Sequence, residues 1–466
     1  MVGLIRDTCP AFKRDQRIRP KKIVLRVRPP CRGRCAQATN ESGREKSKPS
    51  YQNSMDHPAL VGRLMELIRK TIFIKEWEII DMDFMLSEEE TQFKEQCQHF
   101  ASEILTPISN KYGETDDLPT EMIRAMAEAE FFKLLIPEEL GGKGIKALKI
   151  CLAREVLAGA YCPADVTLAM QGLGSYPIFL AGNETQKEKY LPRIGEGELL
   201  TTYALTEPEA GSDVNGIKSH AEEAPGGFLL NGRKRFISNG HAAGIVIVFA
   251  KTPLEENARA LSAFVLEKGM EGFKVSKRLP VMAPHDLVEL EFTNCHIPKE
   301  NLLGELGDGY RIAMKTLDLF RMSVGAAAVG IGQTALSAAK AYAKERVQFG
   351  SPIATYQAVQ FKLAEMATRI TRARALTFSA AEALDGAVDP EAPSPGVMAA
   401  MAKLTASEVA VWTTDEAVQI FGGYGFMRDY PVERLLRDAK GTEIYEGTNE
   451  IMRLVIAREA TGQTRA

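Results

Sequence analysis

The spacing of apolar residues predicts a run of α-helices between residues 82 and 200. The stretch opens with Ser87 and, three residues later, Glu90, a pairing typical of a capping box at a helix N-terminus. Phe93, Cys97, Phe100 and Ile104 follow at helical spacing, and the pattern continues to about residue 195. We therefore expect an N-terminal α-helical domain over residues 82–200. Its helices should be interrupted at Pro107, at Pro137 and at Gly141 and Gly142.

The period changes between residues 201 and 304, where short β-rich runs replace the helical spacing. Residues 245–250 and 261–266 are continuous apolar runs, and residues 287–292 alternate apolar with acidic residues, as a half-buried strand would. Asn231 and Gly232 lie between two apolar runs, and this dipeptide predicts a hairpin. No helical pattern separates these runs, so we expect an antiparallel β-barrel or sandwich over residues 201–304.

Long helical patterns return after residue 305. Residues 326–345 and 358–384 are rich in Ala, Leu and Lys and carry apolar stripes, which predicts a helical bundle over residues 305–466. The predicted fold class is therefore α+β and mainly α, in the order helices, β domain, helical bundle.

Residues 1–81 form a basic N-terminal extension with 18 Lys and Arg against 9 Asp and Glu, in a chain whose net charge is −3. The first 58 residues are rich in Arg, Lys, Pro and Ser and show no sustained period, which favours a disordered extension or a start codon set too far upstream. The ordered pattern begins near Met82, so we expect a bacterial cytoplasmic protein. The alternative is a mitochondrial transit peptide and a matrix location, although four acidic residues among the first 50 count against it.

Composition excludes several classes of function. The near balance of charges gives no reason to expect a nucleic-acid partner, and no apolar run approaches the roughly 18 residues needed to span a bilayer. Cys31 and Cys35 are the one close pair among seven cysteines, and the six histidines lack metal-ligand spacing. We therefore expect no metal, no nucleic acid and no membrane span.

A carboxylate stands on a glycine corner near the C-terminus, in Tyr445-Glu446-Gly447-Thr448. Glycine lets a backbone approach a ligand closely, so Glu446 is a candidate general base aimed at a bound carbon acid. The alternative is an acidic residue that the dipole of the following helix favours. The four residues alone favour this structural role.

Each of several other segments allows a functional and a structural interpretation. The loop at 206–213 offers backbone N–H groups to polar ligand atoms or is an ordinary surface turn. Arg346 is either a fork for pyrophosphate or a cation at a helix C-terminus, with Gly350 as the left-handed cap. Two glycines at 422 and 423 would let backbone lie against a cofactor. The one near match to a dinucleotide fingerprint, at 330–335, falls inside a helical pattern, which excludes a Rossmann-type site there.

Together these segments resemble the acyl-CoA dehydrogenase family over almost all of residues 82–466. The resemblance rests on TEPEAGSD at 206–213, FISNG at 236–240, ERVQFG at 345–350, QIFGGYGF at 419–426, YPVERLLRDAK at 430–440 and YEGTNEI at 445–451. These occur in the family's order. The resemblance implies an α-helical domain, a central β domain and a C-terminal four-helix bundle, in an FAD enzyme that oxidises an acyl-CoA to its trans-2-enoyl-CoA.

On this resemblance Glu446 removes the pro-R α-proton while the β-hydrogen leaves as hydride to flavin N5. Phe320 stands where some members carry the base, so Glu446 has no rival. Positions that match FAD contacts are Thr206, Ser212, Phe236, Ser238, Arg346, Phe349, Gln357, Gln419, Gly423, Thr448 and Glu450. Positions that match the substrate side are Ser212, Asp318, Arg321 and Gly447.

Two of these positions depart from the family pattern, because Phe236 and Ser238 replace the common Trp and Thr. The five positions from Arg346 to Gly423 match contacts to the FAD of a neighbouring subunit, which implies a homotetramer. An electron-transferring flavoprotein is the implied electron acceptor. An acyl-CoA oxidase of the same fold and a non-catalytic scaffold are the alternatives. The acyl group depends on pocket shape, and we expect residues around 165–177 to set it.

Overall fold

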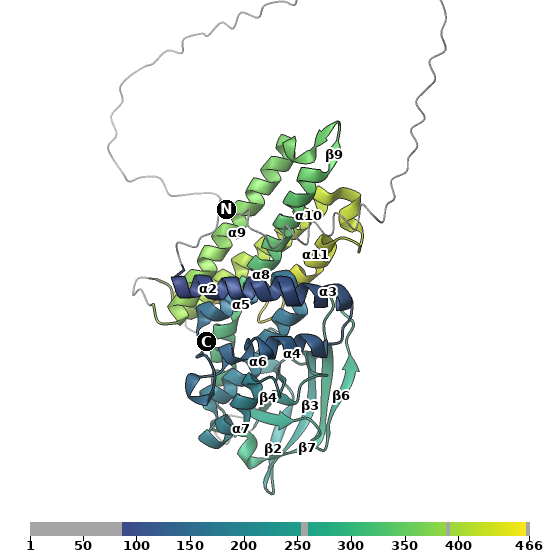
Figure 1. Cartoon of the computed structure of the whole chain (residues 1–466). Helices are drawn as coiled ribbons and strands as arrows, with labels where there is room; N and C mark the ends of the chain where they lie inside the picture. The colour runs from purple at the N-terminus through teal and green to yellow at the C-terminus, as the bar shows by residue number, and fades with distance from the viewer. Residues whose placement is uncertain (1–85, 253–259, 388–391, 463–466) are drawn as a thin grey trace, which may run out of the picture. The chain divides into compact units, whose positions relative to one another are not determined.

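The computed structural model describes residues 86–252, 260–387 and 392–462 (Figure 1). All of them belong to the second of two compact units, Asp56–Ala466. The predicted extension over residues 1–81, with Cys31, Cys35 and the transit-peptide alternative, lies outside the described residues, and so does Met82.

The first helices begin at the predicted capping box. Ser87 Oγ accepts from the backbone N–H of Glu90 at 3.3 Å, and the backbone N–H of Ser87 donates to Glu90 Oε2 at 2.7 Å. The elements of this part are α2 (Glu88–Phe100), η2 (Ala101–Leu105), α3 (Thr106–Tyr112), α4 (Thr120–Glu128), η3 (Phe132–Leu135), η4 (Glu138–Leu140), α5 (Ala147–Ala160), α6 (Cys162–Ala181) and α7 (Glu184–Gly195).

The predicted interruption at Pro107 is wrong. Proline lacks an N–H and its ring clashes with the carbonyl four residues before it. Here α2 continues through a single π-helical turn, η2, and Pro107 then stands in the first turn of α3, where a missing N–H costs little. The interruptions predicted at Pro137 and at Gly141 and Gly142 fall between η3 and α5.

The central domain is one eight-stranded sheet, in the order β6-β7-β3-β2-β4-β5-β8, with β1 paired to β4. Neighbouring strands are antiparallel, except that β1 and β2 run parallel to β4. The elements are β1 (Thr201–Ala204), η5 (Val214–Gly216), β2 (His220–Ala224), β3 (Gly227–Ser238), β4 (Ile245–Lys251), β5 (Leu261–Glu267), β6 (Phe273–Arg278), β7 (Leu287–Pro298), η6 (Lys299–Asn301) and β8 (Leu302–Leu303).

Strands β4 and β5 are buried on both faces, which explains their continuous apolar runs. Ile245, Ile247 and Phe249 on one face of β4 belong to the core shared with the N-terminal helices. Val246 and Val248 on the other face pack inside the sheet domain. The sheet is therefore fixed to the helices through its centre.

The predicted hairpin at Asn231 and Gly232 is wrong. Both residues lie inside the continuous strand β3, at a shift of register against β7. Gly232 has φ +149°, and a Cβ there would lie 2.2 Å from Ser219 Oγ. The glycine serves a β-bulge and a close approach, while the turn between β2 and β3 lies at Gly226, with φ +80°.

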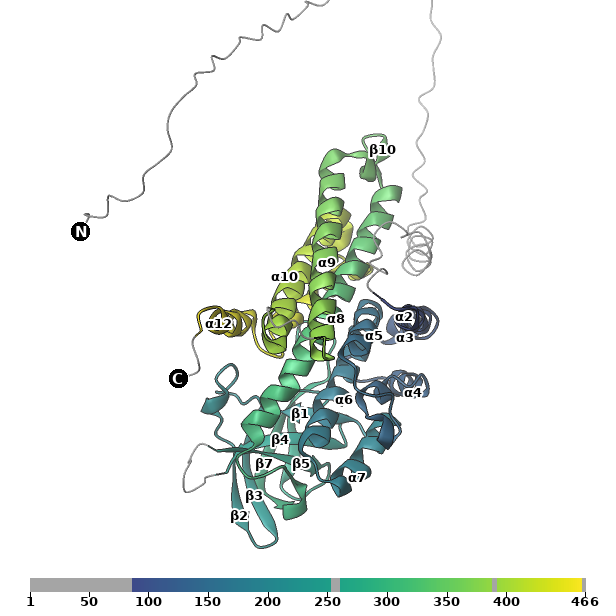
Figure 2. The ribbon, with the colours of Figure 1, turned by 90° about the vertical axis from the view of Figure 1, so that its left-hand side faces the viewer.

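The C-terminal part is a helical bundle in which α8, α9 and α10 run side by side (Figures 1 and 2). Figure 2 shows α8 extending from beside the sheet to the β9–β10 hairpin. The elements are α8 (Gly309–Glu345), β9 (Val347–Gln348), β10 (Ser351–Pro352), η7 (Ile353–Thr355), α9 (Gln357–Leu384), α10 (Pro395–Phe421), η8 (Gly422–Phe426), α11 (Pro431–Thr442) and α12 (Asn449–Ala460).

Helix α8 is long and apolar enough to cross a membrane, but 83% of its most apolar window is buried inside the protein. This burial is that of a core helix. Its glycines allow close packing: a Cβ on Gly330 would lie 1.8 Å from the carbonyl oxygen of Glu155 in α5. The glycines at 330 and 332 therefore lie inside a packed helix, as the sequence indicated, and not in a phosphate-binding turn.

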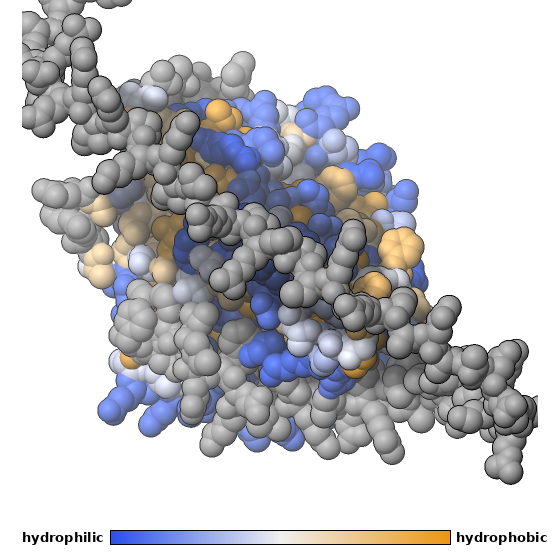
Figure 3. All heavy atoms as spheres, turned by 90° about the horizontal axis from the view of Figure 1, so that it is seen from above, coloured by the Kyte–Doolittle hydropathy of each residue, from blue (hydrophilic) through white to orange (hydrophobic). Residues whose placement is uncertain are grey.

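Gly350 does not cap a helix, contrary to one of the two readings of this segment. Arg346 is the C-cap of α8, and Phe349 (φ +50°) and Gly350 (φ +82°) form the two-residue turn between β9 and β10. The Phe349 side chain is 97% exposed. Figure 3 looks onto the molecule from this end, where orange hydrophobic residues lie among blue hydrophilic ones.

Candidate active site

The Glu446 corner joins α11 to α12 through two successive left-handed residues. Glu446 has φ +54° and Gly447 has φ +100°. A non-glycine residue adopts this conformation only where its surroundings enforce it. The φ of Gly447 is one that L side chains rarely adopt, so the backbone conformation favours glycine at the second position. Thr448 is the N-cap of α12, and its hydroxyl accepts from Ile451 N at 3.4 Å.

Two cations from different helices hold the corner by its carbonyl groups. Arg321 Nε of α8 donates to Glu446 O at 3.1 Å, and Lys403 Nζ of α10 donates to Gly447 O at 2.8 Å. Arg321 also donates to Asp318 Oδ1, and Lys403 to Asn449 Oδ1, both at 2.9 Å. Burial lowers the pKa of Lys403 to about 8. The corner conformation therefore depends on α8 and α10.

The Glu446 carboxylate points into the protein, with its side chain 7% exposed. Oε2 is buried and has no hydrogen-bond partner among the residues that the structure describes. Oε1 lies 4.0 Å from an Arg154 guanidinium nitrogen. Burial raises the pKa of Glu446 above its ordinary value, while Arg154 and Arg321 oppose the rise. A buried carboxylate with a raised pKa and a free oxygen is suited to accept a proton.

Sequence reasoning missed the groups behind this carboxylate. Arg154 donates to Asp165 Oδ1 at 2.7 Å and Oδ2 at 3.0 Å, and to Ser323 Oγ at 2.7 Å. The available signal was in α6, where Asp165 is the one charged residue, whereas α5 carries Lys149 and Glu155 beside Arg154. Lys403 gave no such signal, because its helix α10 also carries Glu408, Asp415 and Glu416.

The loop after β1 is held by a buried carboxylate that the sequence analysis did not single out. Glu207 accepts from Lys218 N at 2.6 Å, Ser219 N at 3.0 Å and Lys234 Nζ at 2.8 Å. Thr206, beside it, is half-buried, and its carbonyl accepts from Arg235 N at 2.9 Å. The predicted Ser212 is exposed on the same loop.

Phe236 and Ser238 lie at the end of β3. Phe236 has φ +59°, sits at a register shift in the strand, and leaves 55% of its surface exposed. Ser238 Oγ lies 2.8 Å from His285 Nε2. Burial lowers the pKa of His285 to about 4, so its imidazole is neutral at pH 7. His285 is a further group that the sequence analysis did not single out.

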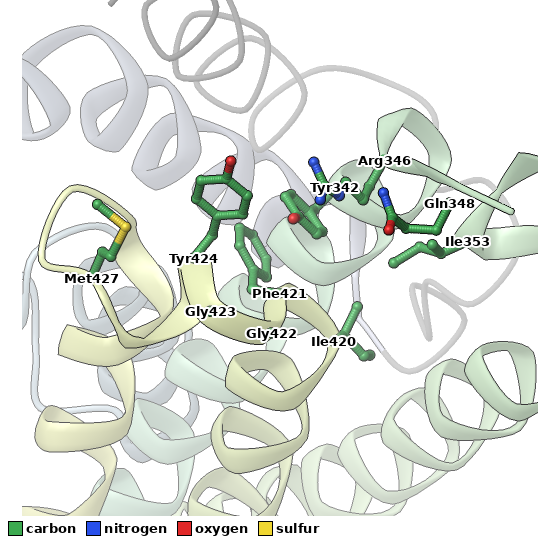
Figure 4. A pocket seen from close by; sticks show the side chains of 10 residues that line it. All are labelled: Tyr342, Arg346, Gln348, Ile353, Ile420, Phe421, Gly422, Gly423, Tyr424 and Met427. Atoms are coloured by element: carbon green, nitrogen blue, oxygen red, sulfur yellow. The ribbon is translucent and has the colours of Figure 1, made fainter. Parts of the chain in front are cut away.

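A second region, without Glu446, is a pocket of about 620 Å³ at the far end of α8 (Figure 4). Tyr342 and Phe421 stack with ring centroids 4.1 Å apart, and the Arg346 guanidinium lies 5.4 Å from the Tyr424 ring centroid. A Cβ on Gly423 would meet open space. Figure 4 shows the three rings side by side, with Arg346 and Gln348 next to them.

The structure thus separates the predicted residues into groups. Arg321 binds the carbonyl of Glu446, Asp318 binds Arg321, and Gly447 follows Glu446 in the chain. Arg346 and Gly423 instead line the second pocket. Arg321 and Arg346 are 25 residues apart along α8, about 37 Å at the α-helical rise per residue. The remaining predicted residues are exposed at helix or strand ends: Phe349 in the β9–β10 turn, Gln357 at the start of α9, Gln419 in the last turn of α10 and Glu450 in the first turn of α12.

Known proteins match the chain over nearly all described residues. The family models for the N-terminal, middle and C-terminal domains of acyl-CoA dehydrogenase match residues 87–198, 202–295 and 307–461. An acyl-CoA dehydrogenase of Bacillus subtilis (strain 168) is 42% identical over 382 residues, covering 81% of this chain and 100% of that protein.

Solved structures agree. A chain in a structure of the electron transferring flavoprotein of Acidaminococcus fermentans has a TM-score of 0.77 at 42% identity, covering 82% of this chain and 100% of that chain. Butyryl-CoA dehydrogenase from Megasphaera elsdenii has a TM-score of 0.76 at 39% identity, covering 81% and 99%.

The fold and the matches define an oxidoreductase acting on the CH–CH bond of acyl-CoA, with FAD as cofactor. The chain belongs to the acyl-CoA dehydrogenase family. The described residues fit a dinucleotide: Gly423 leaves open space beside the Arg346 guanidinium, and the aromatic ring of Phe236 is exposed next to Ser238. Within the described ranges, no group of three or more His, Cys, Asp or Glu is placed to hold a metal ion.

Proposed function

We propose that Glu446 is the general base that removes the α-proton of a bound acyl-CoA thioester. The observation that carries this proposal is the buried Oε2 atom, which has no partner among the described residues, on a carboxylate whose pKa burial raises. The left-handed corner aims the side chain inward, and Arg321 and Lys403 keep it there. The backbone N–H of Glu446 is our candidate donor to the thioester oxygen, since the nascent enolate needs one.

FAD, when bound, supplies the acceptor for the β-hydrogen as hydride at flavin N5. We assign Thr206, Ser212, Phe236, Ser238, Thr448 and Glu450 to FAD contacts. We assign Ser212, Asp318, Arg321 and Gly447 to the substrate side. Arg346, Phe349, Gln357, Gln419 and Gly423 hold, in this proposal, the FAD of a second copy. Support comes from the separation along α8, because Arg346 lies about 37 Å from Arg321 of the same chain. A homotetramer is the assembly that we propose.

The acyl group that we propose is short and uncharged. The similarity to a butyryl-CoA dehydrogenase supports the short chain. Two of the described cations beside Glu446 are already paired with carboxylates, Arg154 with Asp165 and Arg321 with Asp318. Neither guanidinium is therefore free to compensate a second carboxylate on the acyl group.

The substitution Glu446→Gln tests the base. We expect the variant to retain its flavin and to lose at least about 100-fold in the rate of anaerobic flavin reduction by butyryl-CoA, the usual contribution of a general base. Glu408→Gln, at an exposed carboxylate of α10 that pairs with Arg453, is the matched control and should keep the rate. Flavin reduction at the wild-type rate in Glu446→Gln would refute the proposal.

The electron acceptor separates our proposal from an oxidase of the same fold. We propose an electron-transferring flavoprotein, supported by the similarity to a chain in a structure described for such a flavoprotein. Substrate-reduced enzyme should pass electrons to that protein faster than to oxygen. Faster reoxidation by oxygen, with stoichiometric hydrogen peroxide, would instead identify an oxidase.

A further inference from the structure

A buried ion pair that has no part in the function proposed above lies behind Glu446. Arg154 of α5 and Asp165 of α6 have side chains 1% and 0% exposed. Two parallel hydrogen bonds of 2.7 and 3.0 Å join the guanidinium to the carboxylate. The remaining terminal nitrogen of Arg154 donates to Ser323 Oγ at 2.7 Å and lies 4.0 Å from Glu446 Oε1.

Stability alone does not explain this pair. Removing two charges from water is costly, and well-packed apolar residues often replace a buried ion pair at no loss of stability. Most buried positions of α5 and α6 are apolar, and the polar ones next to the pair are Glu155 and Thr167. The location of the pair, one contact from the Glu446 carboxylate, points to a role in the chemistry.

We propose that Arg154 and Asp165 are positioning residues that orient the Glu446 carboxylate without making it a weak base. The inference rests on the proposed role of Glu446. An isolated guanidinium at this distance would attract the carboxylate and stabilise its charged form, so the proton acceptor would weaken. Asp165 occupies two of the guanidinium N–H groups and offsets most of that charge. The pair keeps the orientation and limits the loss of basicity.

Charged and titratable groups reach Glu446 from every element around it. Arg154 of α5, Arg321 of α8 and Lys403 of α10 lower its pKa, whereas burial and Asp165 of α6 raise it. Tyr203 of β1 and the neighbouring Tyr445 also interact with the carboxylate. Arg321 and Lys403 are bound to backbone carbonyls that a substitution at Asp165 leaves in place. Asp165 is the negative charge among these causes, so its removal leaves the effect of the three cations on the Glu446 pKa less opposed.

The test is the pH dependence of anaerobic flavin reduction in the holoenzyme. Asp165→Asn exposes Glu446 to an uncompensated guanidinium, so we expect the acidic limb to move to lower pH by about 1 unit. The plateau rate should fall about tenfold, because a weaker base transfers the proton more slowly. The double variant Arg154→Met with Asp165→Asn removes both charges. The acidic limb of its pH–rate profile should lie at higher pH than that of the wild type. Arg154 is the charge closer to Glu446, so loss of its pKa-lowering effect outweighs loss of Asp165.

An equilibrium readout accompanies the kinetics. The infrared C=O band of the protonated carboxyl that Glu446→Gln loses should titrate with the same shifts in the same variants. If the double variant fails to retain flavin, Ser323→Ala releases the Arg154 nitrogen toward Glu446 and should move the limb to lower pH. The proposal would be overturned if the pH–rate profile and the titration of the infrared band were unchanged in every variant that retains flavin. If Glu446→Gln were inactive in the same experiments, the role of Glu446 as the base would stand. An active Glu446→Gln would instead remove the proposed function itself.

Discussion

Two cations hold the backbone of the Glu446 corner at an angle that glutamate does not prefer. Arg321 and Lys403 each donate to one carbonyl, at 3.1 and 2.8 Å. Each carbonyl bond fixes the orientation of one peptide plane, so the two bonds restrict the dihedral angles that aim the side chain. The strain of a left-handed glutamate is in this way offset by contacts from helices far away in sequence.

Lys403→Met should lower kcat for flavin reduction about tenfold or more and leave KM for the acyl-CoA nearly unchanged, because the corner loses one anchor while the substrate contacts remain. The pKa of Lys403 is lowered to about 8, so its ammonium is present below that pH and is lost above it. The wild-type rate should therefore decline as pH rises through about 8, and this decline should be missing in Lys403→Met.

Ser407→Ala is the matched control for this variant. Ser407 donates to the same Asn449 oxygen as Lys403, at 3.1 Å, but carries no charge. A rate profile across alkaline pH that is the same in wild type, Ser407→Ala and Lys403→Met would show that Lys403 does not control the corner.

The sequence predicted those site residues that belong to a recognisable short motif. Glu446 and Gly447 stood on a recognisable corner, and Arg321 and Asp318 followed from the family pattern. Lys403 and His285 have partners that are distant along the chain: Lys403 is 44 residues from Gly447 and His285 is 47 residues from Ser238. Arg154 is 11 residues from Asp165, which lies on the next helix. A lone charged residue in an apolar helix, as Asp165 is in α6, signals a buried pair, but the sequence does not identify its partner.

At the scale of elements, the close crossing of α5 and α8 depends on a single hydrogen atom at Gly330. We expect Gly330→Ala to unfold at a lower temperature than Gly332→Ala. A Cβ at 330 would lie 1.8 Å from a backbone oxygen, whereas at 332 its nearest neighbour is 3.6 Å away. Overpacking of this kind costs about 1–3 kcal/mol, more than the roughly 1 kcal/mol that alanine gains in a helix.

The measurement is the midpoint temperature of thermal unfolding of the two alanine variants in excess FAD, because both variants then carry the same amount of cofactor. Glu155, whose carbonyl oxygen opposes Gly330, cannot move away freely, because its carboxylate accepts from Arg374 Nε at 3.0 Å. Equal midpoints for the two alanine variants would contradict the steric argument.

The hydrophobic period predicted the class of nearly every element, and the structure confirms the predicted fold class. The errors concern places where a strong local signal met a long-range constraint. Asn231 and Gly232 favour a turn, but pairing of β3 with β7 over its full length converts them into a bulge. Pro107 favours a break, but the packing of Ala101 and Leu105, both 0% exposed, keeps the chain helical through a π-turn. The domain boundaries near residues 200 and 304 stay predictions.

At the scale of the whole molecule, one helix carries contacts for two regions about 37 Å apart. Arg346→Gln should lower FAD affinity about 10- to 100-fold, because a lost bond to a charged group costs about 1.5–3 kcal/mol. The purified variant should contain less flavin and regain it at high FAD concentration. Flavin absorbance per protein and sedimentation mass are the measurements.

Arg311→Gln, at the opposite end of α8, is the control for Arg346→Gln. Arg311 forms an exposed ion pair with Asp308 at 2.9 Å and lines neither region. Full flavin content in Arg346→Gln would remove the second pocket from the proposed cofactor site.

The unpartnered oxygen of Glu446 also has a consequence for inhibition. A buried acceptor gains most from a ligand that brings a donor, and a substrate offers only a C–H bond there. An unreactive acyl-CoA analogue with an N–H in place of the α-methylene group would supply that donor. The Glu446 corner would therefore bind such analogues tightly. Their selectivity for this site would depend on the same backbone geometry that orients the Glu446 carboxylate.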